Sequence, residues 1–377
     1  MKIKQILLIT LFFATLITSL LQQNIYILDL FAISTFFMLP FNKWWNRGTI
    51  ALLLFSVFYA IMIILGGHMN SVFMTISYLI APVAFYRFGH FVLSVVHGDE
   101  KRFKFLSYVV LAYLIHLFIL NFVDISIVGI VNEDRILLGM SQEEEAMSAT
   151  LYGLMASVGI GCVATLFATD SKLLTKIIFL ILVVSSMLVV VHLVNRGGLV
   201  VFAITLLLSI FIYHWRNKIK LVKTILFLLV LAFSLFYFDV ISNDVLMAYN
   251  QRHDIQGYET MTAGGRTELW ELSIRNMLSH PLGWEQKSYA HNLWLDLARL
   301  GGWISLLPFL VASLITFKRI SYTLRFRPSS FAKTLVVLNI ALLTASSIEP
   351  VIEGSMLFFS LMMMFWGMID KIASERS

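Results

Sequence analysis

Charged residues are scarce in this sequence, and their scarcity excludes an ordinary soluble domain. They make up 13% of the 377 residues, about half the roughly 25% that is typical of soluble domains. Hydrophobic residues make up 59%, and the mean hydropathy is +0.85. The single cysteine, Cys162, excludes a disulfide framework and a thiolate metal cluster, and its apolar surroundings predict a packing role. The chain also lacks internal repeats and low-complexity tracts.

Long apolar runs are what the sequence has instead. A helix needs ~20 apolar residues to cross a bilayer, and it satisfies its own backbone hydrogen bonds there. We therefore expect an all-α, polytopic membrane protein with about twelve transmembrane helices. The loops are too short for a separate soluble domain, so residues 1–377 are predicted to form a single integral membrane domain. The expected spans are 6–21, 25–41, 49–65, 71–87, 105–122, 147–169, 177–194, 198–213, 224–240, 292–317, 334–348 and 354–370.

The basic residues predict the orientation of these spans. With both termini in the cytoplasm, 21 of the 28 Lys and Arg residues fall on the inner side, as the positive-inside rule requires. Orientation and contact with anionic lipid therefore explain the net charge of +6, and no nucleic-acid partner is expected. The remaining seven lie on the outer side against this bias: Arg135, Arg196, Arg252, Arg266, Arg275, Lys287 and Arg299.

Arg196 is the clearest exception, because it stands between two apolar spans in the stretch NRGGLVV. A charge at membrane depth costs a few kcal/mol, and such charges usually line a cavity or contact a partner. We expect a tight turn at 195–198, in which two glycines permit the close approach of backbone. Snorkelling of Arg196 to the outer headgroups is the alternative. Arg135, in an acidic loop after the fifth span, is a further candidate for an anion site.

The longest polar interruption contains the other motifs, and residues 241–291 are predicted to form a periplasmic catalytic loop. Apolar residues at 269, 270, 274, 277 and 278 have helical spacing, which predicts an amphipathic helix that Pro281 and Gly283 terminate. Arg266 in GGRTELW would lie at the start of this helix, where unpaired backbone N–H groups favour anions. The alternative is an exposed loop arginine. Trp270 and Trp284 are candidates either for stacking on sugars or for interfacial anchoring.

His291 begins the next span in the motif HNLWLDLARLGGW. An imidazole at the membrane mouth is suited to taking a proton near neutral pH, so His291 is a candidate base beside an anion clamp. Glu349, in SSIEPVIEG, is predicted to orient His291 or to bind an acceptor sugar, or else to be an exposed turn carboxylate. Candidates for phosphate or acceptor contacts are Asn292, Arg252, Arg275, Lys287 and Arg299.

Two further sets of residues receive structural interpretations. The Met-rich segment at 360–368 is predicted to fill an apolar core, and His116 and His192 are predicted to contact neighbouring helices. The outer side carries neither an Asp-x-Asp motif nor a His, Cys and carboxylate set at metal-ligand spacing. We therefore expect no metal site and no cofactor.

Together these motifs resemble the O-antigen ligase and polymerase (Wzy-type) superfamily, over residues 190–305 and in whole-chain topology. The ligase signature His-[Asn/Ser/Gln]-x9-Gly-x-x-[Gly/Thr/Tyr] is matched over 291–302 and departs at Ser305. The Arg-x3-Leu signature is matched by Arg196, with Val200 in place of leucine. These departures weaken the distinction between a ligase and a polymerase.

The resemblance implies a membrane glycosyltransferase of the bacterial inner membrane that faces the periplasm. Its donor would be a glycan linked to undecaprenyl diphosphate, and its acceptor lipid A–core or a growing polysaccharide. In this interpretation Arg196 and Arg266 bind the diphosphate, and His291 assists the acceptor hydroxyl in an inverting, metal-independent transfer. Two alternatives are a Wzy-type repeat-unit polymerase and a transporter of lipid-linked glycans. A transporter would place its charges near the bilayer midplane, whereas here they gather at the outer mouth.

Overall fold

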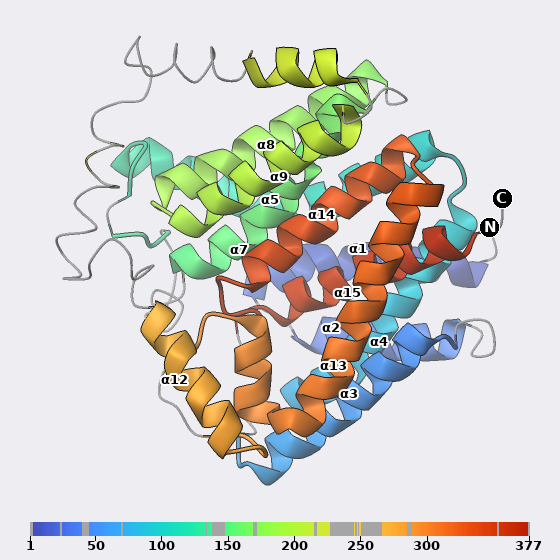
Figure 1. Ribbon diagram of the computed structural model, residues 1–377, viewed down its shortest axis with the longest axis vertical. Helices are drawn as coiled ribbons and strands as arrows, with labels where there is room; N and C mark the ends of the chain where they lie inside the picture. Colours follow the sequence, from blue (N-terminus) through green and yellow to red (C-terminus); the bar gives the residue numbers. More distant parts are fainter. Residues whose placement is uncertain are drawn as a thin grey trace.

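A computed structural model gives the structure of the protein. It describes residues 3–22, 25–39, 45–68, 71–132, 134–137, 148–168, 172–214, 217–226, 245, 247, 249, 266–284, 289–352 and 354–375. Helix is the only regular secondary structure in these residues, which confirms the all-α prediction (Figure 1). The helices are α1 (Ile3–Gln22), α2 (Ile25–Met38), α3 (Arg47–Leu65), α4 (Val72–Val95), α5 (Asp99–Val128), α7 (Ser148–Ile160), the 3-10 helix η2 (Gly161–Phe167), α8 (Leu173–His192), α9 (Arg196–His214), α12 (Arg266–Ser279), α13 (Leu293–Phe326), α14 (Ser330–Ser346) and α15 (Met356–Ser374).

Most of the predicted spans correspond to helices of membrane-crossing character. Among the described residues, eight helical segments are long and apolar enough to cross a bilayer, α7 and η2 counting together as one. Three shorter apolar helices, at Ile3–Thr18, Ile25–Met38 and Ser330–Ser346, match three more predicted spans. The predicted span 224–240 lies almost entirely outside the described residues. The multi-helix membrane protein is thus supported, whereas the count of twelve stays a prediction.

Several helices are longer than their apolar runs. The span predicted at 105–122 is the middle part of α5, and the span predicted at 292–317 is the N-terminal part of α13. The first turn of α5 and the last turns of α13 carry charged residues. Asp99 and Glu100 occupy the first turn of α5, where carboxylates interact favourably with the helix dipole. Hydropathy marks only the part of a helix that lies in lipid, so it underestimates the length of a helix whose end is polar.

Side-chain caps fix where several helices begin. The Asn46 side chain accepts a hydrogen bond from Thr49 N at 2.8 Å and so begins α3. Ser71, Ser329 and Ser355 cap α4, α14 and α15 in the same way. These oxygens satisfy N–H groups that would otherwise lack partners at a helix start. Asn292 caps α13, which places His291 directly outside that helix.

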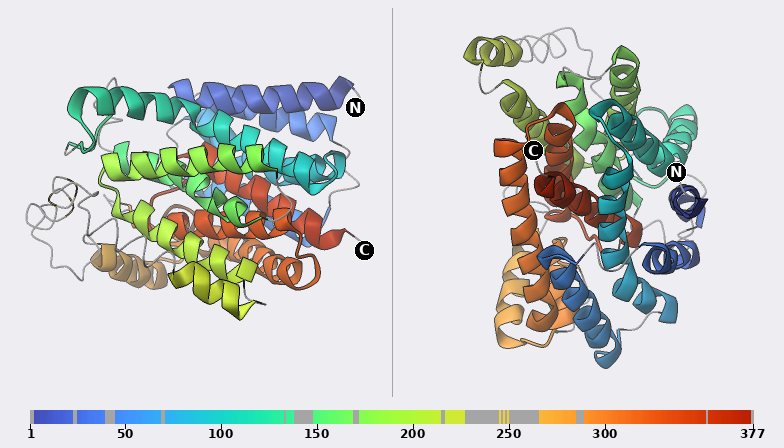
Figure 2. Two further views of the ribbon diagram at one scale, coloured as in Figure 1. Left: turned by 90° about the horizontal axis from the view of Figure 1, so that it is seen from above. Right: turned by 90° about the vertical axis from the view of Figure 1, so that its right-hand side faces the viewer.

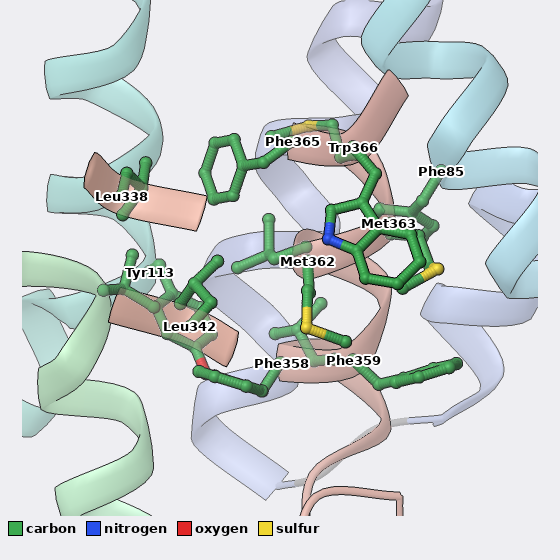
Figure 3. Packing of buried hydrophobic residues seen from close by; sticks show 14 of the residues in the cluster. Phe85, Tyr113, Leu338, Leu342, Phe358, Phe359, Met362, Met363, Phe365 and Trp366 are labelled. Carbon is green, nitrogen blue, oxygen red and sulfur yellow. The ribbon is translucent and has the colours of Figure 1, made fainter. Parts of the chain in front are cut away.

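Helix α15 forms the core of the bundle. Figure 1 shows it between α4, α13 and α14, and nearly all of its side chains are buried. Its Met-rich part packs against aromatic and aliphatic side chains of neighbouring helices, as Figure 3 shows for Met362, Met363 and Trp366. A Cβ atom on Gly367 would lie 2.0 Å from Tyr86 O, so glycine lets α15 approach α4 backbone to backbone. The prediction that residues 360–368 fill an apolar core is confirmed.

The start of α1 and the end of α15 lie at one end of the bundle, and α12 lies near the opposite end (Figure 2). We refer to the end that carries α12 as the outer end. This arrangement fits termini that share one side of the membrane, and the assignment of that side to the cytoplasm stays a prediction. α13 consists of two helical parts that meet at Gly302, where φ is 60°. The part that begins after His291 is therefore short, and it lies beside α12 (Figure 1).

Candidate active site

Glu349 is the carboxylate around which the predicted site residues gather. It lies just after α14, and its side chain is 5% exposed. Oε2 of Glu349 lies 3.0 Å from Nη2 of Arg266 and 3.7 Å from Nδ1 of His291. Its other oxygen, Oε1, lies 3.0 Å from the position that a Cβ atom on Gly197 would occupy. A buried carboxylate is costly unless it is paired, and here it connects three segments that are distant in sequence.

Arg266 is the first residue of α12, as predicted, and its side chain is 22% exposed. The amphipathic helix ends at Ser279, two residues before Pro281, which also confirms the prediction. The indole Nε1 of Trp270 donates to Ala290 O at 2.7 Å and ties α12 to the residue before His291. Trp284 is buried, so its ring belongs to the core rather than to a sugar-stacking surface.

Arg196 begins α9, and this corrects the predicted turn at 195–198. The chain reverses earlier, at Leu193 to Asn195, with a positive φ of 49° at Val194. Gly197 and Gly198 lie instead within the first turn of α9. A Cβ atom on Gly198 would lie 2.4 Å from Cγ2 of Val190, so the glycines permit close packing rather than the turn itself.

The Arg196 side chain contacts the polypeptide of the outer loop. Its Nη2 donates to the carbonyl oxygen of Tyr249, whose hydroxyl donates in turn to Val190 O at 3.1 Å. The helix start is fixed by Asn195, whose Oδ1 accepts from Gly198 N at 2.8 Å and whose Nδ2 donates to Ala149 O at 2.7 Å. These contacts favour a position within the protein over snorkelling to headgroups.

Arg135 lies close enough to this cluster to interact with it electrostatically. Burial lowers the pKa of its guanidinium from the ordinary value, and the Glu349 carboxylate opposes that shift by raising the pKa. The charges of Arg266 and Arg196 lower the pKa further. Nε of Arg135 donates to Leu193 O at 3.2 Å, which holds it against the turn that precedes α9.

The backbone around His291 is strained and held by a buried aspartate. His291 has a positive φ of 53°, which is uncommon for a residue with a Cβ atom. Oδ1 of Asp296 accepts from Ala290 N at 2.8 Å, and Oδ2 accepts from Asn292 N at 3.2 Å. The Asp296 carboxylate thus accepts hydrogen bonds from the residues on either side of His291, and these bonds stabilise the strained conformation.

Asn292 and Arg299 have structural contacts in the same region. Oδ1 of Asn292 caps α13, and its Nδ2 donates to Ser347 O at 3.2 Å, which brings His291 to the segment that carries Glu349. The Arg299 side chain is 8% exposed and lies 3.9 Å from Asp296 Oδ1, with the Tyr289 ring 5.8 Å away. Arg299 therefore supports the local packing, and none of these contacts joins it to the cluster of Glu349, Arg266 and His291.

Backbone hydrogen bonds join the HPLGW motif (residues 280–284) to the residues around the kink of α13, which include the GGW motif (residues 301–303). Trp284 N donates to Arg299 O at 2.9 Å, and Trp303 N donates to Pro281 O at 2.8 Å. A Cβ atom on Gly302 would lie 2.6 Å from Pro281 O, so a side chain there would disrupt the hydrogen bond between Trp303 N and Pro281 O. These motifs hold α12, with Arg266 at its start, against the short first part of α13.

The remaining candidates lie apart from the cluster or outside the described residues. Arg275 is exposed on α12 and pairs with Glu271 one turn earlier. Arg252 and Lys287 lie outside the described residues, as does about half of the predicted catalytic loop 241–291. In the parts of the chain that the structure describes, no group of three or more His, Cys, Asp and Glu side chains could hold a metal ion.

The sequence missed two buried carboxylates that shape the site. Asp296 lies in an apolar run five residues after His291, and Asp124 lies in the outer part of α5. Asp124 Oδ2 lies 2.7 Å from His192 Nε2, and both side chains are fully buried. An acidic residue inside an apolar span was the available signal. The prediction that His192 contacts a neighbouring helix is confirmed.

Comparison with known families agrees with the motifs. A family model described as O-antigen ligase matches residues 180–287, which is less than a third of the chain. The matched segment includes Arg196 and Arg266 and ends four residues before His291. No curated protein matches the chain. The family match confirms the resemblance to the O-antigen ligase and Wzy-type superfamily, and it supports an O-antigen ligase-type, glycosyltransferase-like function for this membrane protein.

Proposed function

We propose that the protein transfers a glycan from undecaprenyl diphosphate to an acceptor at the periplasmic face of the bacterial inner membrane. The acceptor class is lipid A–core or a growing polysaccharide. The family match supports the glycosyltransferase class. The single observation that carries the assignment of residues is the buried Glu349 carboxylate, which contacts Arg266 and His291 and packs against Gly197, the neighbour of Arg196.

The proposed role of Arg196 and Arg266 is to bind the diphosphate of the donor. When the bond between the anomeric carbon and the diphosphate oxygen breaks, negative charge develops on the leaving group. Guanidinium groups remain protonated and offer paired donors to phosphate oxygens, so they neutralise that charge without needing a metal ion. Both arginines start a helix, and the N–H groups at a helix N-terminus add to the attraction for an anion.

The proposed role of His291 is that of general base. Its Nδ1 is buried and lacks a hydrogen-bond partner among the described residues, and it faces Glu349 at 3.7 Å. The other ring nitrogen, Nε2, would take the proton of the acceptor hydroxyl as its oxygen attacks the anomeric carbon. The diphosphate leaves from the opposite side, so the configuration inverts. The Glu349 carboxylate would stabilise the imidazolium that forms.

Separate His291→Ala and Arg196→Ala variants test this function in cells that depend on the protein, with their membrane levels measured. We expect both variants to abolish the surface polysaccharide. Arg275→Ala, which removes an exposed arginine of the same loop, is the matched control and should leave it unchanged. Normal polysaccharide in either site variant would show that the proposed roles are wrong.

The lipid that accumulates in a null strain identifies the reaction. Polymer that accumulates on the carrier beside bare lipid core indicates a ligase. A single repeat unit on the core indicates a polymerase. A lipid-linked glycan that is retained on the cytoplasmic face would contradict a transferase and indicate a transporter.

A further inference from the structure

Arg135 lies in a loop that buried polar groups hold against the start of α9. Asn132 N donates to His192 O at 2.8 Å, so the loop after α5 is joined to the end of α8. The Asn132 side chain donates to Asp124 Oδ2 at 2.7 Å and accepts from Arg135 N at 2.9 Å. Asp124 is itself paired with His192. Fully paired polar groups of this kind rigidify a buried region.

The backbone of Arg135 is strained within this loop. Its φ is 62°, a conformation that costs energy for a residue other than glycine and that persists only where the surroundings impose it. The hydrogen bond from Nε to Leu193 O directs the side chain toward the turn before Arg196. Three groups therefore fix Arg135: Asn132 at its backbone, Leu193 at its side chain and the Asp124–His192 pair beneath the loop.

The charges in this region do not balance. Arg135, Arg196 and Arg266 contribute three positive charges, and Glu349 contributes one negative charge, so these four groups sum to +2. Asp296 and Arg299 offset each other beside them. A lipid diphosphate esterified at both ends carries two negative charges. Two arginines with the carboxylate would leave the diphosphate only half neutralised, whereas the third arginine completes its neutralisation.

We propose that Arg135 is a third diphosphate-binding residue, which contacts the lipid-linked donor together with Arg196 and Arg266. The proposal rests on the proposed function, because it extends the same anion site by one residue. The desolvation of Arg135 and its electrostatic interaction with Glu349, Arg196 and Arg266 support it. The Asp124–His192 pair acts through the loop as a positioning element and does not touch the donor.

Binding of undecaprenyl diphosphate and undecaprenyl monophosphate to the full chain in lipid nanodiscs tests this assignment. The Arg135→Gln variant should bind the diphosphate about 10- to 100-fold more weakly than the wild type, because it loses one charged contact. Monophosphate binding should weaken less, because fewer phosphate charges remain unneutralised. Arg135→Lys should bind the diphosphate with intermediate affinity, since it retains the charge. Arg275→Gln is the matched control and should bind both lipids as the wild type does.

The same measurements separate the two proposals. If Arg196→Gln binds the diphosphate as the wild type does, the proposed function fails. If Arg196→Gln loses binding while Arg135→Gln retains both its affinity and its preference for the diphosphate, only the assignment of Arg135 is overturned. Equal loss of both lipids by Arg135→Gln, with a lower melting temperature in the absence of lipid, would show that Arg135 merely anchors the loop and would also overturn it.

Discussion

Glu349→Gln separates the two roles that the structure gives to one carboxylate. The substitution preserves the size of the side chain and removes its charge. Arg266 then loses a charged partner at 3.0 Å, and His291 loses a negative charge at 3.7 Å. These losses act on different steps, because Arg266 is proposed to bind the donor and His291 to accept a proton. Donor affinity and turnover should therefore change in opposite directions.

The magnitudes follow from the two distances. In the resting protein Glu349 competes with phosphate for Arg266, so its neutralisation should tighten diphosphate binding, by up to about 10-fold or ~1.4 kcal/mol. Two unit charges at ~4 Å interact by ~4 kcal/mol at an effective dielectric constant of 20. The imidazole is 27% exposed, so we take about half of that value for stabilisation of the imidazolium. A loss of ~2 kcal/mol corresponds to a kcat lower by about 30-fold.

The assay combines diphosphate binding in nanodiscs with the rate of undecaprenyl diphosphate release from a lipid-linked donor in the presence of an acceptor-bearing membrane extract. Glu271→Gln is the matched control, because Glu271 forms an exposed ion pair with Arg275 on α12. It should change neither quantity, since exposed pairs contribute little. An unchanged kcat in Glu349→Gln would refute the proposed stabilisation of the imidazolium by Glu349. Weaker diphosphate binding together with lower thermal stability would show that Glu349 is a structural residue.

Two other substitutions test the supports of the site. Asp296→Asn replaces one of two accepting oxygens with an amide that cannot accept from an N–H group, so the turn at His291 should loosen. We expect kcat to fall about 10-fold and the affinity for the diphosphate to stay unchanged. An equal loss of kcat and of diphosphate affinity would contradict the idea that Asp296 acts only by holding His291 in position. Asp124→Leu should lower the free energy of unfolding by about 3–5 kcal/mol, because it removes the carboxylate that pairs with both His192 Nε2 and Asn132 Nδ2 in a buried region. Asp124→Leu combined with His192→Leu should recover part of that loss in thermal melts, because Asn132 still lacks its carboxylate acceptor, whereas simple additivity would show that Asp124 and His192 are uncoupled.

Hydropathy predicted the fold well where a helix lies wholly in lipid. Eleven of the predicted spans correspond to apolar helices of the described residues, because burial in a bilayer requires apolar side chains over a defined length. The same signal could not find the polar ends of α5 and α13, nor the break at Gly302. At that break Gly302 packs closely against Pro281 and Leu282, which lie before α13 in the chain, so the contact leaves no periodic pattern in the sequence.

The candidate site was predictable to the extent that its charges oppose the topology. Arg196 and Arg266 stand out because basic residues are scarce on the outer side, and the structure places Arg266 3.0 Å from Glu349 and Arg196 next to Gly197, which packs against that carboxylate. Arg275 satisfied the same criterion, yet it lies on the exposed face of α12. Sequence alone cannot separate these cases, because the direction of a side chain on a short amphipathic helix depends on which face packs against α13.

The Arg-Gly-Gly sequence has a physical explanation in the space around Glu349. A side chain at Gly197 would place its Cβ atom 3.0 Å from Oε1 of Glu349 and from Cδ1 of Ile348. One at Gly198 would collide with Val190 of the preceding helix. The first turn of α9 can therefore pack against Glu349 and against Val190 of α8 because residues 197 and 198 lack side chains. A larger residue at 197 would require the Glu349 or the Ile348 side chain to shift, and any shift of Glu349 would change together its distances to Arg266 and His291, on which both proposed roles depend.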